Sequence, residues 1–169
     1  MRRILVLLTC ILCAGCGYHT AGHGNLLPPD MRTLAVPAFV NKTQTYKIEQ
    51  TLTAAVVQEF TTRTKYQITA DPASADATLL GTVLTTNTTP LTYDSTTGRA
   101  SSVQVIVSMK VVLTDRAGQV LYQNPSYVFR EQYQVSQDLT SFFEEDSPAF
   151  QRLSREFART LVSNVLEAF

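Results

Sequence analysis

The chain has 169 residues, with 14 basic and 14 acidic side chains and a formal net charge of zero. This balance excludes the overall positive charge that draws proteins to nucleic acid or to anionic lipid head groups, so an anionic ligand must meet a local basic cluster. The length predicts one domain with its own hydrophobic core.

Residues 1–15 have the pattern of a secretory signal peptide. Two arginines precede the apolar run Ile4–Leu12, and the small residues Ala14 and Gly15 follow, as signal peptidases require beside their cut. The run is too short to span a bilayer, which takes about 20 apolar residues. Removal of this segment leaves 12 basic and 14 acidic residues, a net charge of −2.

Cys16 follows the small residues directly. The segment Cys13-Ala14-Gly15-Cys16 resembles a bacterial lipobox, although Cys13 stands where leucine is usual. We therefore predict that Cys16 is lipidated; a plain secreted protein and an uncleaved anchor are the alternatives. The run Cys10, Cys13, Cys16 also has a metal-site spacing, but signal cleavage would remove its first two members.

Residues 16–31 are predicted to form a lipidated tether, because glycine and proline are frequent there and periodicity is weak. A single folded domain is expected over residues 32–169. His19 and His23 have the spacing of a helical metal site. Glycines flank His23, so we interpret both histidines as solvated linker residues.

The folded domain is expected to begin with a strand over Thr33–Val40 that is apolar on both faces. Pro37 lacks an N–H group and indicates an edge position or a bulge. A helix is predicted over about Tyr46–Arg63, with Thr43 or Thr45 as its N-cap. Its apolar face repeats every three or four residues: Ile48, Leu52, Ala55, Val56 and Phe60.

Three long strands are predicted next, over Ala77–Tyr93, Ser101–Asp115 and Gln119–Gln134, with turns at Asp94–Arg99 and Arg116–Gly118. Tyr66–Thr69 is a candidate for a further short strand. The first long strand is predicted to place Leu80, Thr82, Leu84 and Thr86 on one face. The middle strand has the clearest alternation, with Val103, Val105, Val107, Met109, Val111 and Leu113 on one face.

The last helix is predicted from Ser147-Pro148 to about Ala168, since proline suits the first turn. Its apolar stripe is Phe150, Leu153, Phe157, Leu161, Val165 and Phe169. The element order is then β-α-β-β-β-α. Two helices packed on one face of a four-stranded, mostly antiparallel sheet would bury both stripes, so the fold class is predicted to be an α+β two-layer sandwich.

No catalytic pattern accompanies this fold. The chain has neither a P-loop nor a dinucleotide-binding glycine motif, and Glu144-Glu145-Asp146 is interpreted as helix-start charge favoured by the helix dipole. We expect no enzyme activity, no catalytic residue, no cofactor and no metal site. An unrecognised hydrolase is the competing class, and it would need a buried cluster of acids or histidines.

One sheet face is expected to meet a partner, because the strands leave many apolar and aromatic residues for a wet surface. Covering of both faces by loops and helices is the alternative. Lys110, Arg130 and, at a turn, Arg99 are cations beside apolar strands. Such groups suit a lipid that carries phosphates, to which arginine can bind through two parallel hydrogen bonds.

Four short segments in order resemble the lipopolysaccharide-assembly lipoprotein family LptE: Cys16-Gly17-Tyr18-His19, Leu34-Ala35-Val36-Pro37, Val128-Phe129-Arg130-Glu131 and Ser141-Phe142-Phe143-Glu144-Glu145. The resemblance covers essentially the whole mature chain. It implies an outer-membrane lipoprotein, on the periplasmic side, that plugs and helps to assemble the LptD β-barrel and binds lipopolysaccharide on its way to the cell surface.

The same resemblance implies that basic residues on the sheet and its loops bind lipopolysaccharide. Arg99 and Arg130 are the nearest matches by position, and Lys110 is a third candidate. A second resemblance remains open. Leu34–Thr43 followed by a helix is also similar to the start of periplasmic lipoproteins that activate cell-wall synthases or build secretion pores, the LpoB and CsgG types.

Overall fold

The computed structural model describes residues 31–135 and 146–167. The predicted signal peptide, the predicted tether up to residue 30 (with Cys16, His19 and His23) and Glu144-Glu145 lie outside the described residues. The chain forms short strands β1 (Thr33–Ala35), β2 (Val40–Asn41) and β3 (Gln67–Thr69), and long strands β4 (Ala77–Tyr93), β5 (Ala100–Asp115) and β6 (Val120–Gln134). The helices are α2 (Ile48–Arg63), the one-turn 3₁₀ helix η2 (Pro72–Ser74) and α3 (Asp146–Glu167).

The strands form one mixed sheet in the order β3-β1-β4-β5-β6, with β2 also paired to β4. The three long strands are antiparallel, whereas β1, β2 and β3 make parallel pairs. The α+β class is confirmed, but the sheet has six strands instead of four. The expected strand Thr33–Val40 is split around Pro37, which has no N–H group for a ladder hydrogen bond.

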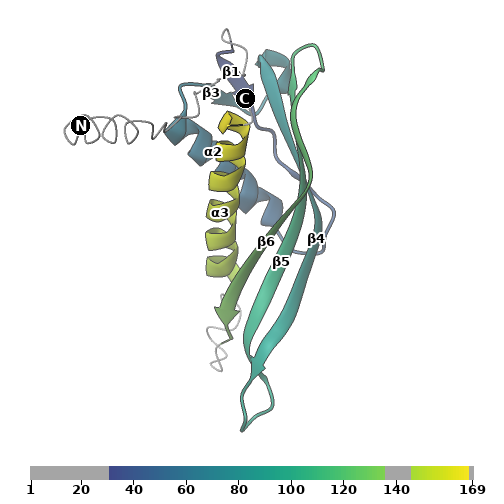
Figure 1. The fold of residues 1–169 in the computed structure, drawn as a ribbon, viewed down its shortest axis with the longest axis vertical. Coiled ribbons are helices and arrows are strands. Elements are labelled where there is room, and N and C mark those ends of the chain that lie inside the picture. The colour runs from purple at the N-terminus through teal and green to yellow at the C-terminus, as the bar shows by residue number, and fades with distance from the viewer. Residues whose placement is uncertain (1–30, 136–145, 168–169) are drawn as a thin grey trace, which may run out of the picture.

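The two long helices lie side by side on one face of this sheet, as predicted (Figure 1). A hydrogen bond of 2.7 Å from the Arg63 guanidinium to the Ser163 hydroxyl joins α2 to α3. Between helices and sheet, the predicted stripes are buried: Ile48, Leu52, Val56 and Phe60 from α2, and Leu153, Phe157, Leu161 and Val165 from α3.

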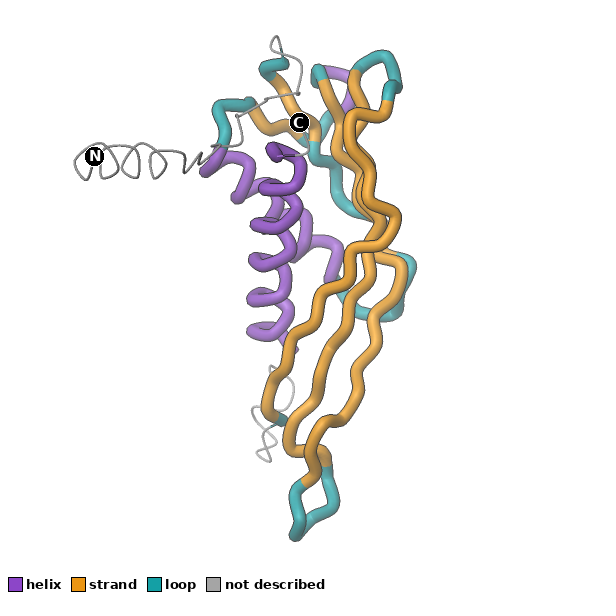
Figure 2. The backbone as a smooth tube through the Cα atoms, viewed as in Figure 1, coloured by secondary structure: helices purple, strands orange, loops and turns teal. Residues whose placement is uncertain are grey.

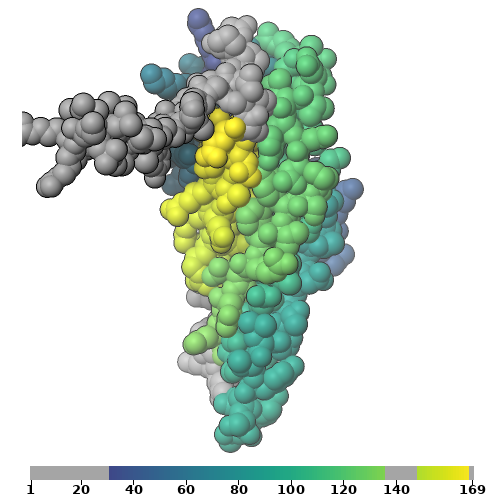
Figure 3. Space-filling model, in the orientation of Figure 1, coloured from purple at the N-terminus to yellow at the C-terminus, as the bar shows by residue number. Residues whose placement is uncertain are grey.

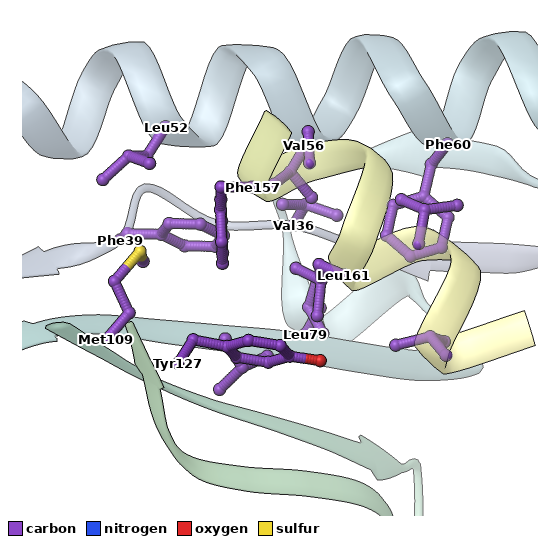
Figure 4. Close-up of a cluster of buried hydrophobic side chains, with 14 of the residues drawn as sticks. Val36, Phe39, Leu52, Val56, Phe60, Leu79, Met109, Tyr127, Phe157 and Leu161 are labelled. Carbon is purple, nitrogen blue, oxygen red and sulfur yellow. The ribbon is translucent and has the colours of Figure 1, made fainter. Parts of the chain in front are cut away.

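Phe157 is central to this core (Figure 4). Its ring makes edge-on contacts with Phe39, Tyr127 and Phe129, at centroid distances of 6.4, 6.0 and 5.1 Å. Phe39 in turn packs on the backbone of β4 at Gly81, where an added Cβ atom would lie 2.6 Å from the ring. This position therefore needs glycine because of close packing, and the contact fixes the segment between β1 and β2 against β4.

A β-bulge in β4 changes which of its side chains point toward the helices. Val83 pairs with Met109 and Thr85 with Ser108, so Leu84 is an extra residue in the ladder. An extra residue reverses the alternation beyond it. The prediction that Thr86 shares a face with Leu80 is therefore wrong: Thr86 pairs with Val107 on the helix side and lies within hydrogen-bond distance of the Thr43 hydroxyl, at 3.4 Å.

Helix α2 begins two residues later than predicted and lacks the predicted threonine cap. Lys47 precedes it in the left-handed region, with φ of 56°, and makes no side-chain capping bond. The Asn41 side chain organises the preceding loop: its amide donates to the Thr45 carbonyl and to Glu49, and its oxygen accepts from Thr43. Hydrogen bonds of Asn41 thus order the loop before α2, where a threonine N-cap was expected.

Candidate functional site

The sheet face opposite the helices, here called the open face, has no described element packed over it (Figure 2). Its side chains are fixed by strand register, in rows across β4, β5 and β6: Leu80, Val112 and Gln123; Thr85, Ser108 and Val128; Asn87, Ile106 and Arg130; Thr89, Gln104 and Gln132. Apolar, hydroxyl and amide side chains are thus interspersed on this face. Leu80 and Val128 are 49% and 43% exposed, so this face offers apolar area within a polar surrounding.

Lys110 and Arg130, two of the predicted lipopolysaccharide contacts, both lie exposed on the open face. Lys110 is opposite Thr82 on β4, and Arg130 is opposite Ile106, four residues along β5 from Lys110. At about 3.4 Å per residue, the two cations stand roughly 14 Å apart with the Ser108–Val128 pair between them. The two cations share a surface, but they are too far apart to bind the same phosphate group.

Arg99, the third predicted contact, lies on the hairpin tip between β4 and β5, beyond the end of the helices (Figure 1). The Asp94 carboxylate accepts hydrogen bonds from the N–H groups of Thr96 and Thr97, and Gly98 adopts a φ of 65°, which shapes the predicted turn. Leu91 and Tyr93, near the same tip, are 43% and 64% exposed. The tip therefore combines a guanidinium with exposed apolar and aromatic groups.

Arg99 is far from the other two cations. Lys110 follows Arg99 by eleven positions in the chain, a length of roughly 36 Å along an extended strand. The structure therefore brings Lys110 and Arg130 onto one face and leaves Arg99 at the far end. The three residues cannot form a single chelating cluster in this conformation.

A second basic surface, which we did not predict from the sequence as a site, runs along α3. Arg152, Arg155 and Arg159 are all exposed, on the side of the helix opposite its buried stripe. With Glu156 and Thr160 they line a hollow of about 500 Å³. The signal in the sequence is the spacing of three arginines at i, i+3 and i+7, which places them on one helix face.

The carboxylate of Asp76 holds the beginning of β1 in place through hydrogen bonds. The Asp76 carboxylate accepts from the N–H groups of Arg32 and Thr33, both at 3.0 Å, and from the Thr33 hydroxyl at 2.8 Å. The Arg116 guanidinium lies 3.1 Å away. The Arg32 N–H, the Thr33 donors and then Arg116 lower the pKa of Asp76 from 3.8 to about 2. Asp76 thus ties β1 to the start of β4 and to the β5–β6 turn.

A tyrosine pair lies between β6 and α3. The hydroxyls of Tyr122 and Tyr127 are hydrogen-bonded to each other, and the Asn164 amide donates to the Tyr127 hydroxyl at 2.9 Å. Burial, followed by the contact with Tyr127, raises the pKa of Tyr122 to about 12. The Tyr122 phenol therefore keeps its proton to a higher pH than an exposed tyrosine would, which suits a structural hydrogen bond in this network.

Neither a metal site nor a membrane-spanning helix is found in the described ranges. Within residues 31–135 and 146–167, no three side chains of His, Cys, Asp or Glu gather as a metal site would require. No helix in the same ranges combines the length and apolarity needed to cross a bilayer.

Solved structures similar to this chain include three proteins with TM-scores of 0.50 or more. A putative lipoprotein from Caulobacter crescentus CB15 has a TM-score of 0.54 and 12% identity over 76% of this chain and 88% of its own. The PelC dodecamer from Paraburkholderia phytofirmans has 0.51 and 12%, over 80% and 88%. Uncharacterized lipoprotein B from Nitrosomonas europaea has 0.50 and 10%, over 82% and 88%.

At these identities, the similarity shows a shared fold and nothing finer. No curated protein matched the chain. The model of one protein family, LptE, described as lipopolysaccharide-assembly, matches residues 31–165, which include every described strand and nearly all of α3. The resemblance drawn from the four short segments is thereby confirmed, and the chain belongs to the LptE family of lipopolysaccharide-assembly proteins.

Proposed function

We propose that this protein is an outer-membrane lipoprotein, anchored through Cys16 on the periplasmic side, that plugs and helps to assemble an LptD-like β-barrel during lipopolysaccharide transport. The observation that carries the proposal is the open face: a sheet surface of alternating hydroxyl, amide and apolar groups in a chain of the lipopolysaccharide-assembly family. The role is that of a binding and assembly protein without catalysis.

The composition of the open face suits the inside of a barrel. Lumens of outer-membrane barrels are polar, because lipid-facing and lumen-facing side chains alternate along each strand. Thr82, Ser108 and Gln104 can exchange hydrogen bonds with such a wall, while Leu80 and Val128 supply apolar contact area. Interfaces of this mixed type are as apolar as ordinary protein surface and are held by shape and hydrogen bonds.

The proposed lipopolysaccharide contacts divide into two places. At the tip, Arg99 can bind a phosphate while Leu91 and Tyr93 contact acyl chains, which matches an amphiphilic ligand. On the open face, Lys110 and Arg130 can each attract a phosphate separately, given their spacing. We propose that Arg99 and Arg130 are the main contacts, with Lys110 as a third.

Co-purification tests the assembly role. The full-length lipoprotein, tagged at its C-terminus and extracted from membranes in mild detergent, should recover an LptD-like barrel identified by mass spectrometry. A strain that expresses the untagged lipoprotein, extracted in parallel, controls for background binding. Recovery of a cell-wall synthase instead would favour the LpoB or CsgG type, and recovery of neither would reject both.

The anchor is tested by labelling. Radiolabelled palmitate should enter the wild-type protein and should be absent from a Cys16→Ala variant, which is expected to be soluble. Cell fractionation of the wild type should place the label in the outer membrane. Labelling that persists in the variant would show that another residue carries the lipid.

Ligand binding is tested with purified lipopolysaccharide. Arg99→Ala combined with Arg130→Ala should weaken binding, and thermal melting should confirm that the domain stays folded, because both side chains are exposed. Lys65→Ala, an exposed cation off the open face, is the matched control. Unchanged binding by the single and double variants would remove these residues from the proposal.

A further inference from the structure

The outer side of α3 carries three exposed arginines, of which Arg152 alone has an ion-pair partner among the described residues. Arg152, Arg155 and Arg159, here called the α3 arginine row, lie along one exposed helix face. Figure 3 shows α3, in yellow, as an outer surface of the molecule beside β6. We propose that the α3 arginine row docks on carboxylates of the barrel wall, so that the protein contacts its barrel through both outer surfaces. This inference rests on the proposed plug function.

The internal contacts of the row leave most of its charge available. Arg152 donates to the Glu131 carboxylate at 2.5 Å, which fixes the β6 end of the row. For Arg155 and Arg159, the described residues offer neither an ion pair nor a hydrogen-bonded partner. Within residues 31–135 and 146–167, these two guanidiniums, each with five N–H donors, therefore keep their hydrogen-bonding capacity for an external anion.

A protein carboxylate fits this surface better than a membrane of anionic lipid. Glu156 is exposed between Arg152 and Arg159 and lines the same hollow. A carboxylate in this position repels a dense layer of phosphates, but it can pair with a cation on a mixed-charge protein wall. The predicted mature chain is also slightly acidic, so no overall charge draws it to an anionic surface.

The spacing of the row also matches a wall of strands. Along a helix, Arg152 and Arg155 are separated by roughly 4.5 Å and Arg155 and Arg159 by roughly 6 Å. Neighbouring strands lie about 4.8 Å apart, and side chains on one face of a strand recur about every 6.8 Å. A helix lying across strands can therefore offer successive arginines to carboxylates on neighbouring strands.

Charge reversal is the first test. In full-length lipoprotein co-expressed with its LptD-like barrel, Arg155→Glu with Arg159→Glu should lower the amount of barrel recovered about tenfold, because like charges would then face each other. Lys42→Glu with Lys65→Glu, two exposed cations away from α3, makes the same change in net charge and should leave recovery within about twofold of wild type.

Zero-length cross-linking is the second test, and it reports the chemistry directly. Arg155→Lys and Arg159→Lys variants keep the charge and provide an amine that a carbodiimide joins to a carboxylate in contact with it. We expect mass spectrometry to find each new lysine joined to an aspartate or glutamate of the barrel. The wild type, whose arginines do not react, is the control.

The outcomes separate this inference from the proposed function. If the wild type recovers no barrel, the plug function fails and the inference fails with it. If the wild type recovers the barrel, the inference alone is overturned by full recovery with the reversed charges, or by lysines that link to no carboxylate of the barrel. Binding of the purified wild type, but not of the reversed variant, to phosphatidylglycerol vesicles would overturn it in favour of a membrane surface.

Discussion

The two faces of the sheet differ sharply in burial. On β5, the helix side carries Val105, Val107, Met109 and Val111, each 1% exposed or less. The alternate residues of the same strand, including Ser108 and Lys110, lie on the open face, and Lys110 is exposed. One strand therefore provides both the core and the proposed contact surface, and substitutions on its two sides should have separable effects.

The largest loss of stability is expected from Phe157→Ala on the helix side. This change removes three aromatic contacts from a fully buried site and leaves a cavity, which typically costs about 3–5 kcal/mol. Urea unfolding of the Cys16→Ala protein, followed by circular dichroism, measures it. Val128→Ala on the open face is the control, and a similar loss in both would erase the distinction between the faces.

Gly81→Ala should have the next largest effect, about 1–3 kcal/mol, because its Cβ atom would overlap the ring of Phe39. Its neighbour Thr82, on the open face, should tolerate alanine far better. Phe39→Leu in the same protein should reduce the extra cost of Gly81→Ala, since the residues are in contact. Strictly additive losses would show that the close approach to Phe39 is not the cause.

Asp76→Asn should cause a smaller, pH-dependent loss of stability, because Asp76 lies at the end of the sheet near β1. Because folding lowers the pKa of Asp76 from 3.8 to about 2, its contribution to stability is complete above about pH 4 and is lost as the pH falls through 2. The melting temperature of the variant should therefore lie below that of wild type at pH 6, and the difference should shrink between pH 4 and pH 2. A constant difference across that interval would contradict the assignment.

The smallest change in stability is expected on the open face. Leu80→Gln and Val128→Gln should each alter the unfolding free energy by about 0.5 kcal/mol or less, because both residues are already about half exposed and lie away from the core. The same pair of substitutions should lower recovery of the barrel in co-purification. A large loss of stability would instead mean that this face belongs to the core.

The sequence predicted the features that depend on local periodicity. Alternation from Val103 to Leu113 identified β5 and its buried side, and three- and four-residue spacing identified both helix stripes. The turns at Asp94–Arg99 and Arg116–Gly118 were also predictable. Gly98 and Gly118 indeed have positive φ, a conformation that glycine adopts without strain.

The features that were predicted wrongly or missed depend on contacts between segments distant in the sequence. The bulge at Leu84 arises from pairing with β5, and a run of threonines and leucines does not reveal where a ladder gains a residue. The parallel pairing of β1, β2 and β3 is equally non-local. For the site, alternation along the strands predicts the side of the sheet on which Lys110 and Arg130 lie. The spacing of Arg152, Arg155 and Arg159 likewise places them on one face of α3, but that pattern alone does not separate a binding surface from an ordinary solvated helix face.

The length of β4 bears on how the proposed lipid anchor and the proposed ligand site are arranged. Its 17 residues extend over roughly 55 Å, with the Asp76 contacts to Arg32 at one end and Arg99 at the other. A bilayer with its head groups is about 40–45 Å thick. If the protein is the barrel plug proposed above and its sheet stands along the barrel axis, the predicted tether leaves the fold near one surface of the membrane while the tip reaches the opposite surface. The proposed lipid anchor and the proposed lipopolysaccharide ligand would then meet the protein in different leaflets.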